Sequence, residues 1–339
     1  MTKNNYYNFL IFIIISFLVL FFCYRDFLVT YRMMLLDSYF PYYQYQNQII
    51  YLLTGDESFK DDLPMNIRFL GIYLQLLLYK ILPCIKLTGI ELVGRNELYE
   101  CTTFSLAVLN YICKYIFLIL FFLYVKNKLT RSIIESFISL LLAIIFLQYL
   151  ENFTLDRLTI LYFTIILYFL NNTKISNILI LLSVLVNEKI IMVLGPIFFI
   201  RFLCYGQNKS NLLTSFITVF TYIAMILILN KFFGYQFSEL YDDAGFYKII
   251  LNIFNKSHLS NSLIPILFCI IPYIISITLK NKFDHKYSNY EILIPLIMWL
   301  LAYGGGENNI GRYVMHTMPL WIPIFASQII YFLKIKKIF

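Results

Sequence analysis

The chain has 339 residues, of which 60% are hydrophobic and 14% are charged, and its mean hydropathy is +0.74. Soluble domains average about 45–50% apolar and 25% charged residues, so the composition argues against a soluble protein. The net charge of +8 does not by itself indicate a nucleic-acid partner, because basic residues in a membrane protein first set its topology. No polar stretch is long enough to form a separate core, which predicts one transmembrane domain over residues 1–339.

The first apolar run, 9–24, follows Lys3 and has the outline of a signal peptide. No small-x-small cleavage site comes after it, since the next residues are Arg25, Asp26 and Phe27. We therefore interpret this run as a membrane anchor rather than a cleaved segment.

Ten apolar stretches are candidate membrane spans, because a spanning helix needs about 20 residues, or fewer when its ends are wet. They are 9–24, 103–125, 132–149, 158–170, 176–187, 190–203, 212–230, 262–279, 291–304 and 317–333. The stretches 39–53 and 66–84 are also apolar, but they contain Gln, Arg68 and Lys80 within a loop rich in acids. We predict that these two are amphipathic helices on the membrane surface. The expected fold is an all-α polytopic bundle.

The charges predict the orientation of the bundle. If the N-terminus is cytoplasmic, the inner loops hold 13 basic residues and only three acids, as the positive-inside rule requires. The basic residues are Lys3, Lys126, Lys128, Arg131, Lys174, Arg201, Lys209, Lys280, Lys282, Lys286, Lys334, Lys336 and Lys337, and the acids are Glu135, Asp284 and Glu291. Counting 66–84 as a span would invert every later loop. The protein is therefore expected in a bacterial inner membrane, with both termini in the cytoplasm.

The polar residues gather on the opposite, outer side. Two long outer loops are expected at about 25–102 and 231–261, and three tight turns carry ENFTLDR, NEK and GGGENNIGRY. The six cysteines show no CxxC spacing, so no metal site is expected from them. Cys84 and Cys101 both fall in the first outer loop, where a disulfide is one possibility.

Asp37 opens the segment DSYFPYYQY shortly after the first span. A carboxylate at the membrane interface can act as a general base and deprotonate a sugar hydroxyl. The aromatic residues behind it suit both sugars and the interface. The alternative is a solvated loop acid without a catalytic role.

Two of the tight turns carry further candidates. Glu151 and Asp156 flank the turn ENFTLDR, and a helix N-cap is an equal alternative for Asp156. The triplet from Asn187 to Lys189 interrupts a run too long for one span, and polar groups in its middle would be costly in lipid. Glu188 and Lys189 either pair with each other or hold substrate, with Lys189 on a phosphate.

Arg312 lies in GGGENNIGRYVMHTMP directly before the last span, with Glu307 and Tyr313 in the same turn. A guanidinium there suits bidentate binding of a phosphate or pyrophosphate, and the alternative is an arginine that snorkels to the interface. His316 receives no role. Lys114 is the one charge near the middle of a predicted span, so it needs a partner or a water-filled cavity.

This layout resembles the integral-membrane glycosyltransferases of the C superfamily (GT-C). Asp37 in DSYFPYY is similar to the catalytic acid that opens their first outer loop. PMNIRFLGIYLQLL, with Arg68, is similar to their Pro…Arg segment entering an amphipathic helix. ENFTLDR, NEK and GRYVMHTMPLWIP are similar to their later acidic, Lys/Glu-bearing and Arg-Tyr turns. The chain departs from the family in having no clean DxD motif and no C-terminal soluble domain.

The resemblance implies an inverting transferase that moves a sugar from a polyprenyl-phosphate donor to a glycan, lipid or protein acceptor, without a metal or other cofactor. It implies catalytic roles for Asp37, Glu151 and Asp156. It implies substrate-binding roles for Arg68, Glu188, Lys189, Glu307, Arg312 and Tyr313. A nucleotide-driven or zinc-dependent reaction is not expected, since no P-loop or HExxH motif is present.

Three alternatives stay open on the sequence alone. An O-antigen or capsule polymerase shares the many spans and the polyprenyl substrates, but typically carries arginines in two large outer loops. A transporter or flippase would favour charged or broken helices at the midplane and internal symmetry, for which only Lys114 and the NEK break speak. A structural scaffold would not need acids at five separate outer turns.

Overall fold

The computed structural model describes residues 3–36, 43–60, 68–82, 97–130, 132–147, 155–236 and 314–335, together with positions 267, 271, 274 and 275. Within these ranges the chain forms helices and turns and no strand. The predicted all-α class is therefore confirmed for the described part of the chain.

The described helices follow the predicted apolar segments closely. They are α1 (Lys3–Leu36), α2 (Tyr43–Thr54), α3 (Phe69–Ile81), α4 (Glu97–Tyr124), α5 (Ile133–Phe146), α6 (Asp156–Tyr168), α7 (Thr173–Leu182), α8 (Glu188–Tyr205), α9 (Lys209–Phe233) and α15 (Met318–Ile335). A 3-10 turn, η1 (Glu57–Phe59), follows α2, and a π-helical turn (Val125–Thr130) ends α4. The predicted spans 262–279 and 291–304 lie outside the described residues, apart from four helical positions in the first.

Three segments are long and apolar enough to cross a membrane, namely Leu10–Leu28, Glu100–Thr130 and Lys209–Phe233. The chain is thus a membrane protein with three candidate spanning helices. Helices α5, α6 and α7 have 14, 13 and 10 residues. At 1.5 Å per residue these helices are roughly 15–21 Å long, less than the hydrocarbon thickness of about 30 Å. The other predicted spans do not meet these criteria of length and composition in the described residues, so they stay predictions.

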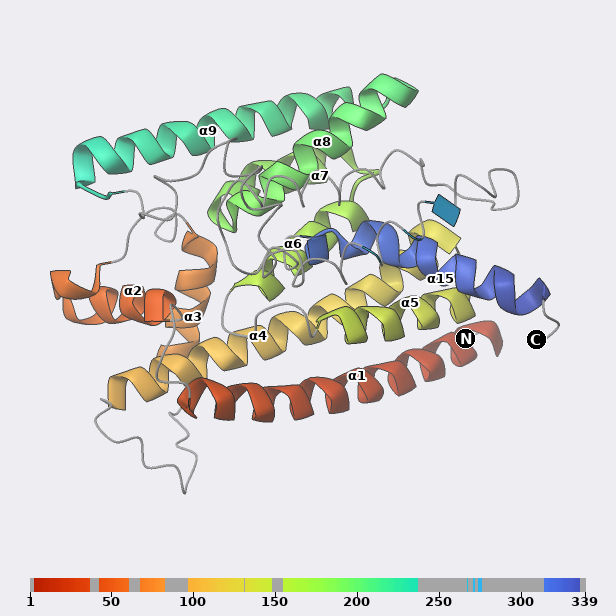
Figure 1. The fold of residues 1–339 in the computed structure, drawn as a ribbon, viewed down its shortest axis with the longest axis horizontal. Helices are drawn as coiled ribbons and strands as arrows, with labels where there is room; N and C mark the ends of the chain where they lie inside the picture. The colour runs from red at the N-terminus through yellow and green to blue at the C-terminus, as the bar shows by residue number, and fades with distance from the viewer. Residues whose placement is uncertain are drawn as a thin grey trace.

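The helices alternate in direction, as Figure 1 shows. Helix α4 lies centrally and packs against α1, α3, α5 and α6, while α7, α8 and α9 form a neighbouring layer joined to it through α6. The start of α1 and the end of α15 lie at the same end of the bundle.

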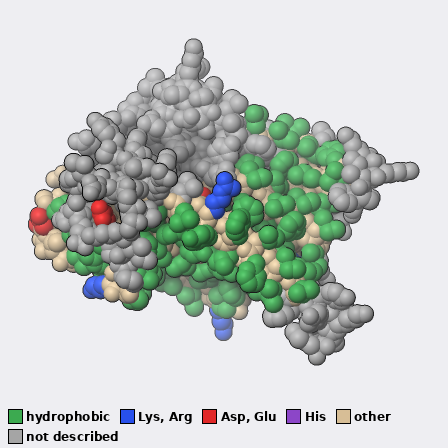
Figure 2. Space-filling model, turned by 90° about the horizontal axis from the view of Figure 1, so that it is seen from below, with side chains coloured by type: hydrophobic (Ala, Val, Ile, Leu, Met, Phe, Trp, Pro, Cys, Tyr) green, Lys and Arg blue, Asp and Glu red, His purple; other side chains and the backbone are tan. Residues whose placement is uncertain are grey.

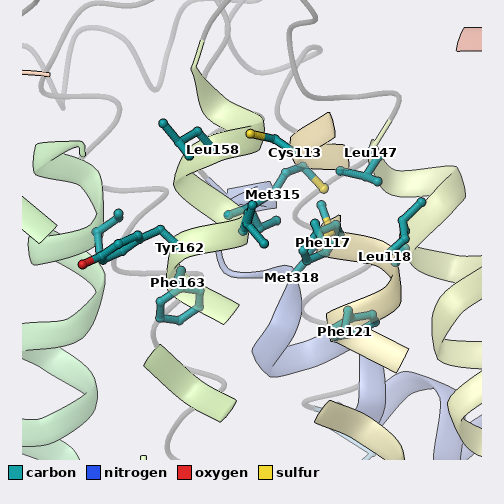
Figure 3. Packing of buried hydrophobic residues seen from close by; sticks show 14 of the residues in the cluster. Cys113, Phe117, Leu118, Phe121, Leu147, Leu158, Tyr162, Phe163, Met315 and Met318 are labelled. Carbon is teal, nitrogen blue, oxygen red and sulfur yellow. The ribbon is translucent and has the colours of Figure 1, made fainter. Parts of the chain in front are cut away.

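The core cluster is built from buried residues of α1, α4, α5, α6, α8 and α15, with smaller contributions from other helices. Figure 3 shows Phe117 and Phe121 of α4 close to Met318 at the start of α15 and to Met315 just before it, and all four side chains are buried. The outer surface is apolar as well: Figure 2, seen from the α1 side, shows hydrophobic side chains over most of the described surface. Apolar exposure on this scale marks a membrane or partner surface, and a bilayer would cover it.

Two details differ from the sequence prediction or extend it. The first span was predicted to end at position 24, but α1 continues to Leu36, so Asp26 lies in a helix rather than in a loop. Helix α3 has 13 residues and runs across the direction of α4 in Figure 1. Its length of about 20 Å is less than the hydrocarbon thickness, as for α5, α6 and α7, so the interfacial position of α3 stays a prediction.

Cys101, near the start of α4, is disulfide-bonded. Cys84, which the sequence suggested as one possible partner, lies outside the described residues. Cys23, Cys113 and Cys204 are free thiols. Disulfides persist mainly in oxidising compartments.

Candidate functional site

Asp156 is the first residue of α6 and lies buried beside Lys189 and His316. Its Oδ1 atom is 3.6 Å from Nζ of Lys189 and 3.0 Å from Nε2 of His316. The N-cap position of α6 belongs to Leu155, and no side chain makes a capping hydrogen bond there. The structure therefore does not give Asp156 the capping role that the sequence left open. Its carboxylate instead joins the starts of α6 and α8 to the residues just before α15.

Arg68 and Glu188 form a second buried ion pair beside this one. Arg68 Nε donates to Glu188 Oε2 over 3.1 Å, and Arg68 Nη2 donates to Glu188 Oε1, so the contact is bidentate. Burial on its own would raise the pKa of Glu188. The positive charge and hydrogen bonds of Arg68, with the charge of Lys189, outweigh burial and hold that pKa below its usual range. Glu188 is therefore ionised at neutral pH.

The NEK turn directs its two charges to different helices. Asn187 caps α8, because its Oδ1 accepts from the backbone N–H of Lys189 over 3.0 Å. The Asn187 Nδ2 donates to Thr159 Oγ1 of α6 over 2.9 Å, which ties the turn to α6. Glu188 then reaches Arg68 and Lys189 reaches Asp156. We call Arg68, Asp156, Glu188, Lys189 and His316 the Asp156 cluster.

The structure thus brings together four of the nine residues that the sequence selected, namely Arg68, Asp156, Glu188 and Lys189. His316, to which the sequence analysis gave no role, joins them. The other five candidates, Asp37, Glu151, Glu307, Arg312 and Tyr313, lie outside the described residues. Their place relative to the cluster stays a prediction.

A second buried network, which we call the Asp26 triad, was not predicted. Asp26 Oδ2 of α1 accepts from Lys114 Nζ of α4 over 2.6 Å and from Arg157 Nη2 of α6 over 2.9 Å. The sequence did signal that Lys114 needed a partner, but it did not name Asp26. Arg157 was overlooked beside Asp156, although the two adjacent residues serve the two different networks.

The arrangement suits the binding of anions and the positioning of charged groups. In both networks each described carboxylate lies against at least one buried cation, and Asp26 alone among these carboxylates is partly exposed. Buried charge pairs of this kind are common at functional sites. Within the described ranges, no group of three or more His, Cys, Asp or Glu side chains is placed to hold a metal ion.

Gly71 brings α3 close to the start of α6 and so helps to place Arg68. A Cβ atom at Gly71 would lie 2.2 Å from Cδ1 of Leu155, whose side chain is buried. We expect Gly71→Ala to cost about 1–3 kcal/mol of folding free energy through overpacking, seen as a lower melting temperature of the purified protein. Gly195→Ala in α8 is the matched control, because nothing lies within 4 Å of its Cβ position. Equal effects of the two changes would contradict this close approach.

No protein-family model, curated protein or solved structure matches this chain. The functional conclusion therefore stands on the residues and their geometry, together with the resemblance in layout.

Proposed function

We propose that this protein is an integral-membrane glycosyltransferase of the GT-C type. It transfers a sugar from a polyprenyl-phosphate donor to an acceptor on the non-cytoplasmic face, in the assembly of a cell-surface glycan or glycolipid. The observation that carries the proposal is the Asp156 cluster. Four residues from three sequence segments, chosen by their resemblance to this family, form two neighbouring buried ion pairs there.

The chemistry of the reaction calls for such a set. Transfer from a polyprenyl phosphate needs a base for the acceptor hydroxyl and cations for the phosphate that leaves. Asp156 and Glu188 already contact buried cations, and the lowered pKa of Glu188 makes that carboxylate a weak base. The proposal therefore assigns the base to Asp37 and lets Asp156 orient Lys189 and His316.

Lys189 and Arg312 bind the phosphate in this proposal. Arg312 comes four positions before His316, a member of the cluster, and its planar fork suits two phosphate oxygens. Arg68 assists from α3, held in place by Glu188. Glu151, Glu307 and Tyr313 complete the set of groups expected to contact the acceptor or the donor.

The proposed topology has about ten spans, with both termini cytoplasmic and the Asp156 cluster toward the outer face. Three observations support it. The predicted inner loops hold 13 of the 27 basic residues but only three of the 19 acids, the described helices alternate in direction, and Cys101 at the start of α4 is disulfide-bonded.

A transporter of lipid-linked glycans is the second candidate, because Asp26 and Lys114 form an ion pair within two candidate spanning segments. Charges inside membrane helices often mark a transport pathway. The transferase and the transporter differ in what happens to the donor. The transferase releases free polyprenyl phosphate, whereas the transporter leaves the donor intact on the opposite face.

The test uses the full-length protein in proteoliposomes with a polyprenyl-phosphate donor whose sugar is radiolabelled. Membrane extract from the source cell supplies the acceptor. We expect label in an acceptor product together with free polyprenyl phosphate, and we expect both to be lost in Lys189→Met. Intact donor moved across the bilayer, without cleavage, would replace this proposal with the transporter. A ladder of repeating products would indicate the polymerase instead.

A further inference from the structure

The Asp26 triad concentrates two cations on one carboxylate oxygen. Lys114 Nζ and Arg157 Nη2 both donate to Oδ2 of Asp26. The side chains of Lys114 and Arg157 are almost fully buried, at 4% and 3% exposed, while that of Asp26 is 25% exposed. The triad is therefore buried where α4 and α6 contribute their cations, and its partly exposed member is Asp26 on α1.

One positive charge in this triad is not balanced. Among the described residues, Asp26 is the only carboxylate within ion-pair distance of Lys114 or Arg157. Arg157 Nε is also buried, and no hydrogen-bond acceptor reaches it. A buried charge without a counter-charge is strongly unfavourable, and an unpaired donor on the same guanidinium adds to that cost.

We propose that the triad is a binding site for a phosphate group, held by Lys114 and by the unused Nε–H of Arg157. A singly charged phosphate would cancel the excess positive charge and satisfy the open donor. Arginine and lysine are the side chains that proteins use most for phosphate oxygens. This site is separate from the Asp156 cluster, and it does not require that the protein be a transferase.

The residues near Asp26 indicate from which side a phosphate would reach the triad. Asp26 lies on α1, where Phe22, one helical turn earlier on the same face, is exposed, on a helix apolar enough to face lipid. A phosphate carried by a lipid can reach the triad from the bilayer along α1. Free phosphate would use the same two cations, so the chemistry of the site is common to both sources.

Binding is tested with the full-length protein in detergent, with three probes compared. These are farnesyl phosphate, inorganic phosphate, and farnesol as the matched alcohol without the phosphate. Saturable binding, followed by equilibrium dialysis of labelled probe and by the rise in melting temperature that a ligand of the folded state causes, is expected for farnesyl phosphate and not for farnesol. Equal binding of inorganic phosphate would identify a free anion as sufficient.

Two substitutions should act in opposite directions. Lys114→Met removes the excess charge, so it should fold well and weaken farnesyl phosphate binding at least about tenfold, as loss of one charged hydrogen bond implies. Asp26→Asn removes the competing carboxylate, so phosphate binding should tighten. Lys209→Met, at an exposed position in α9, is the control and should change neither.

The proposal is overturned if farnesyl phosphate and inorganic phosphate both fail to bind the wild-type protein, or if farnesol binds as well as farnesyl phosphate. It is also overturned if Lys114→Met binds as tightly as the wild type, because a neutral Lys114 in a purely structural triad predicts that result. If Lys114→Met does not fold, Lys114→Gln takes its place. The proposed donor site around Lys189 would also bind farnesyl phosphate, so the Lys114→Met and Asp26→Asn comparisons are repeated in a Lys189→Met background. Changes in binding that persist there belong to the Asp26 triad, so the two proposals fail separately.

Discussion

Replacing Arg68 with methionine is expected to lower the free energy of unfolding by about 3–5 kcal/mol, because the change leaves Glu188 charged and buried without its partner. The pair is bidentate and nearly closed to water. It also joins the start of α3 to the start of α8, which are 120 positions apart in sequence. The measurement is the unfolding free energy in detergent, followed by intrinsic fluorescence.

A double-mutant cycle separates the effect of losing the Arg68–Glu188 pair from the cost of leaving Glu188 buried and charged without a partner. Arg68→Met combined with Glu188→Leu should recover much of the stability, since a buried pair replaced by apolar groups is often neutral. Glu57→Gln provides the surface control. Glu57 pairs with Lys60 over 3.5 Å but is 71% exposed, and such pairs contribute little. A wild-type stability for Arg68→Met would mean that the pair is open to water.

Most of the described helices could be predicted because their signal is local. An apolar run bounded by polar turns marks a membrane helix wherever lipid must be faced, and the segments around α4, α5, α8 and α9 all follow this rule. The end of α1 could not be predicted in the same way. Arg25 and Asp26 interrupt the apolar run, but Asp26 is stabilised inside the helix by Lys114, which is 88 positions away.

The pairing of charges within the site could not be predicted for a related reason. Glu188 and Lys189 are adjacent in sequence, which suggested that they pair with each other. At the start of a helix, however, neighbouring residues point about 100° apart around the axis, so the two side chains face different helices. Asp156 and Arg157 repeat this pattern at the start of α6. The sequence marks such turns as polar, but tertiary packing decides which charges meet.

Replacing Asp37 with asparagine is expected to reduce glycosyl transfer about 10²–10⁴-fold, the usual contribution of a positioned general base. The structure makes this expectation more specific, because two other acids, Asp156 and Glu188, already contact cations. Asp156 lies against Lys189 and His316, and Glu188 is bound by Arg68. Glu188, whose pKa is held below its usual range, accepts a proton poorly, and the buried carboxylate of Asp156 is already in contact with Lys189. Among the acids singled out for catalysis, Asp37 and Glu151 are left as bases, and Asp37 has the aromatic neighbours that suit a sugar acceptor.

The experiment compares Asp37→Asn with Glu151→Gln and Asp56→Asn at equal membrane abundance, measuring labelled product per unit of protein. Asp56→Asn is the matched control, because Asp56 is an exposed acid that caps the turn η1 through Ser58. Asparagine keeps that capping acceptor, so activity should stay at the wild-type level. Full activity in Asp37→Asn with loss in Glu151→Gln would move the base to Glu151. Full activity in both variants would exclude Asp37 and Glu151 as general bases. The remaining carboxylates, Asp156 and Glu188, are held by cations, so the general-base proposal would then fail.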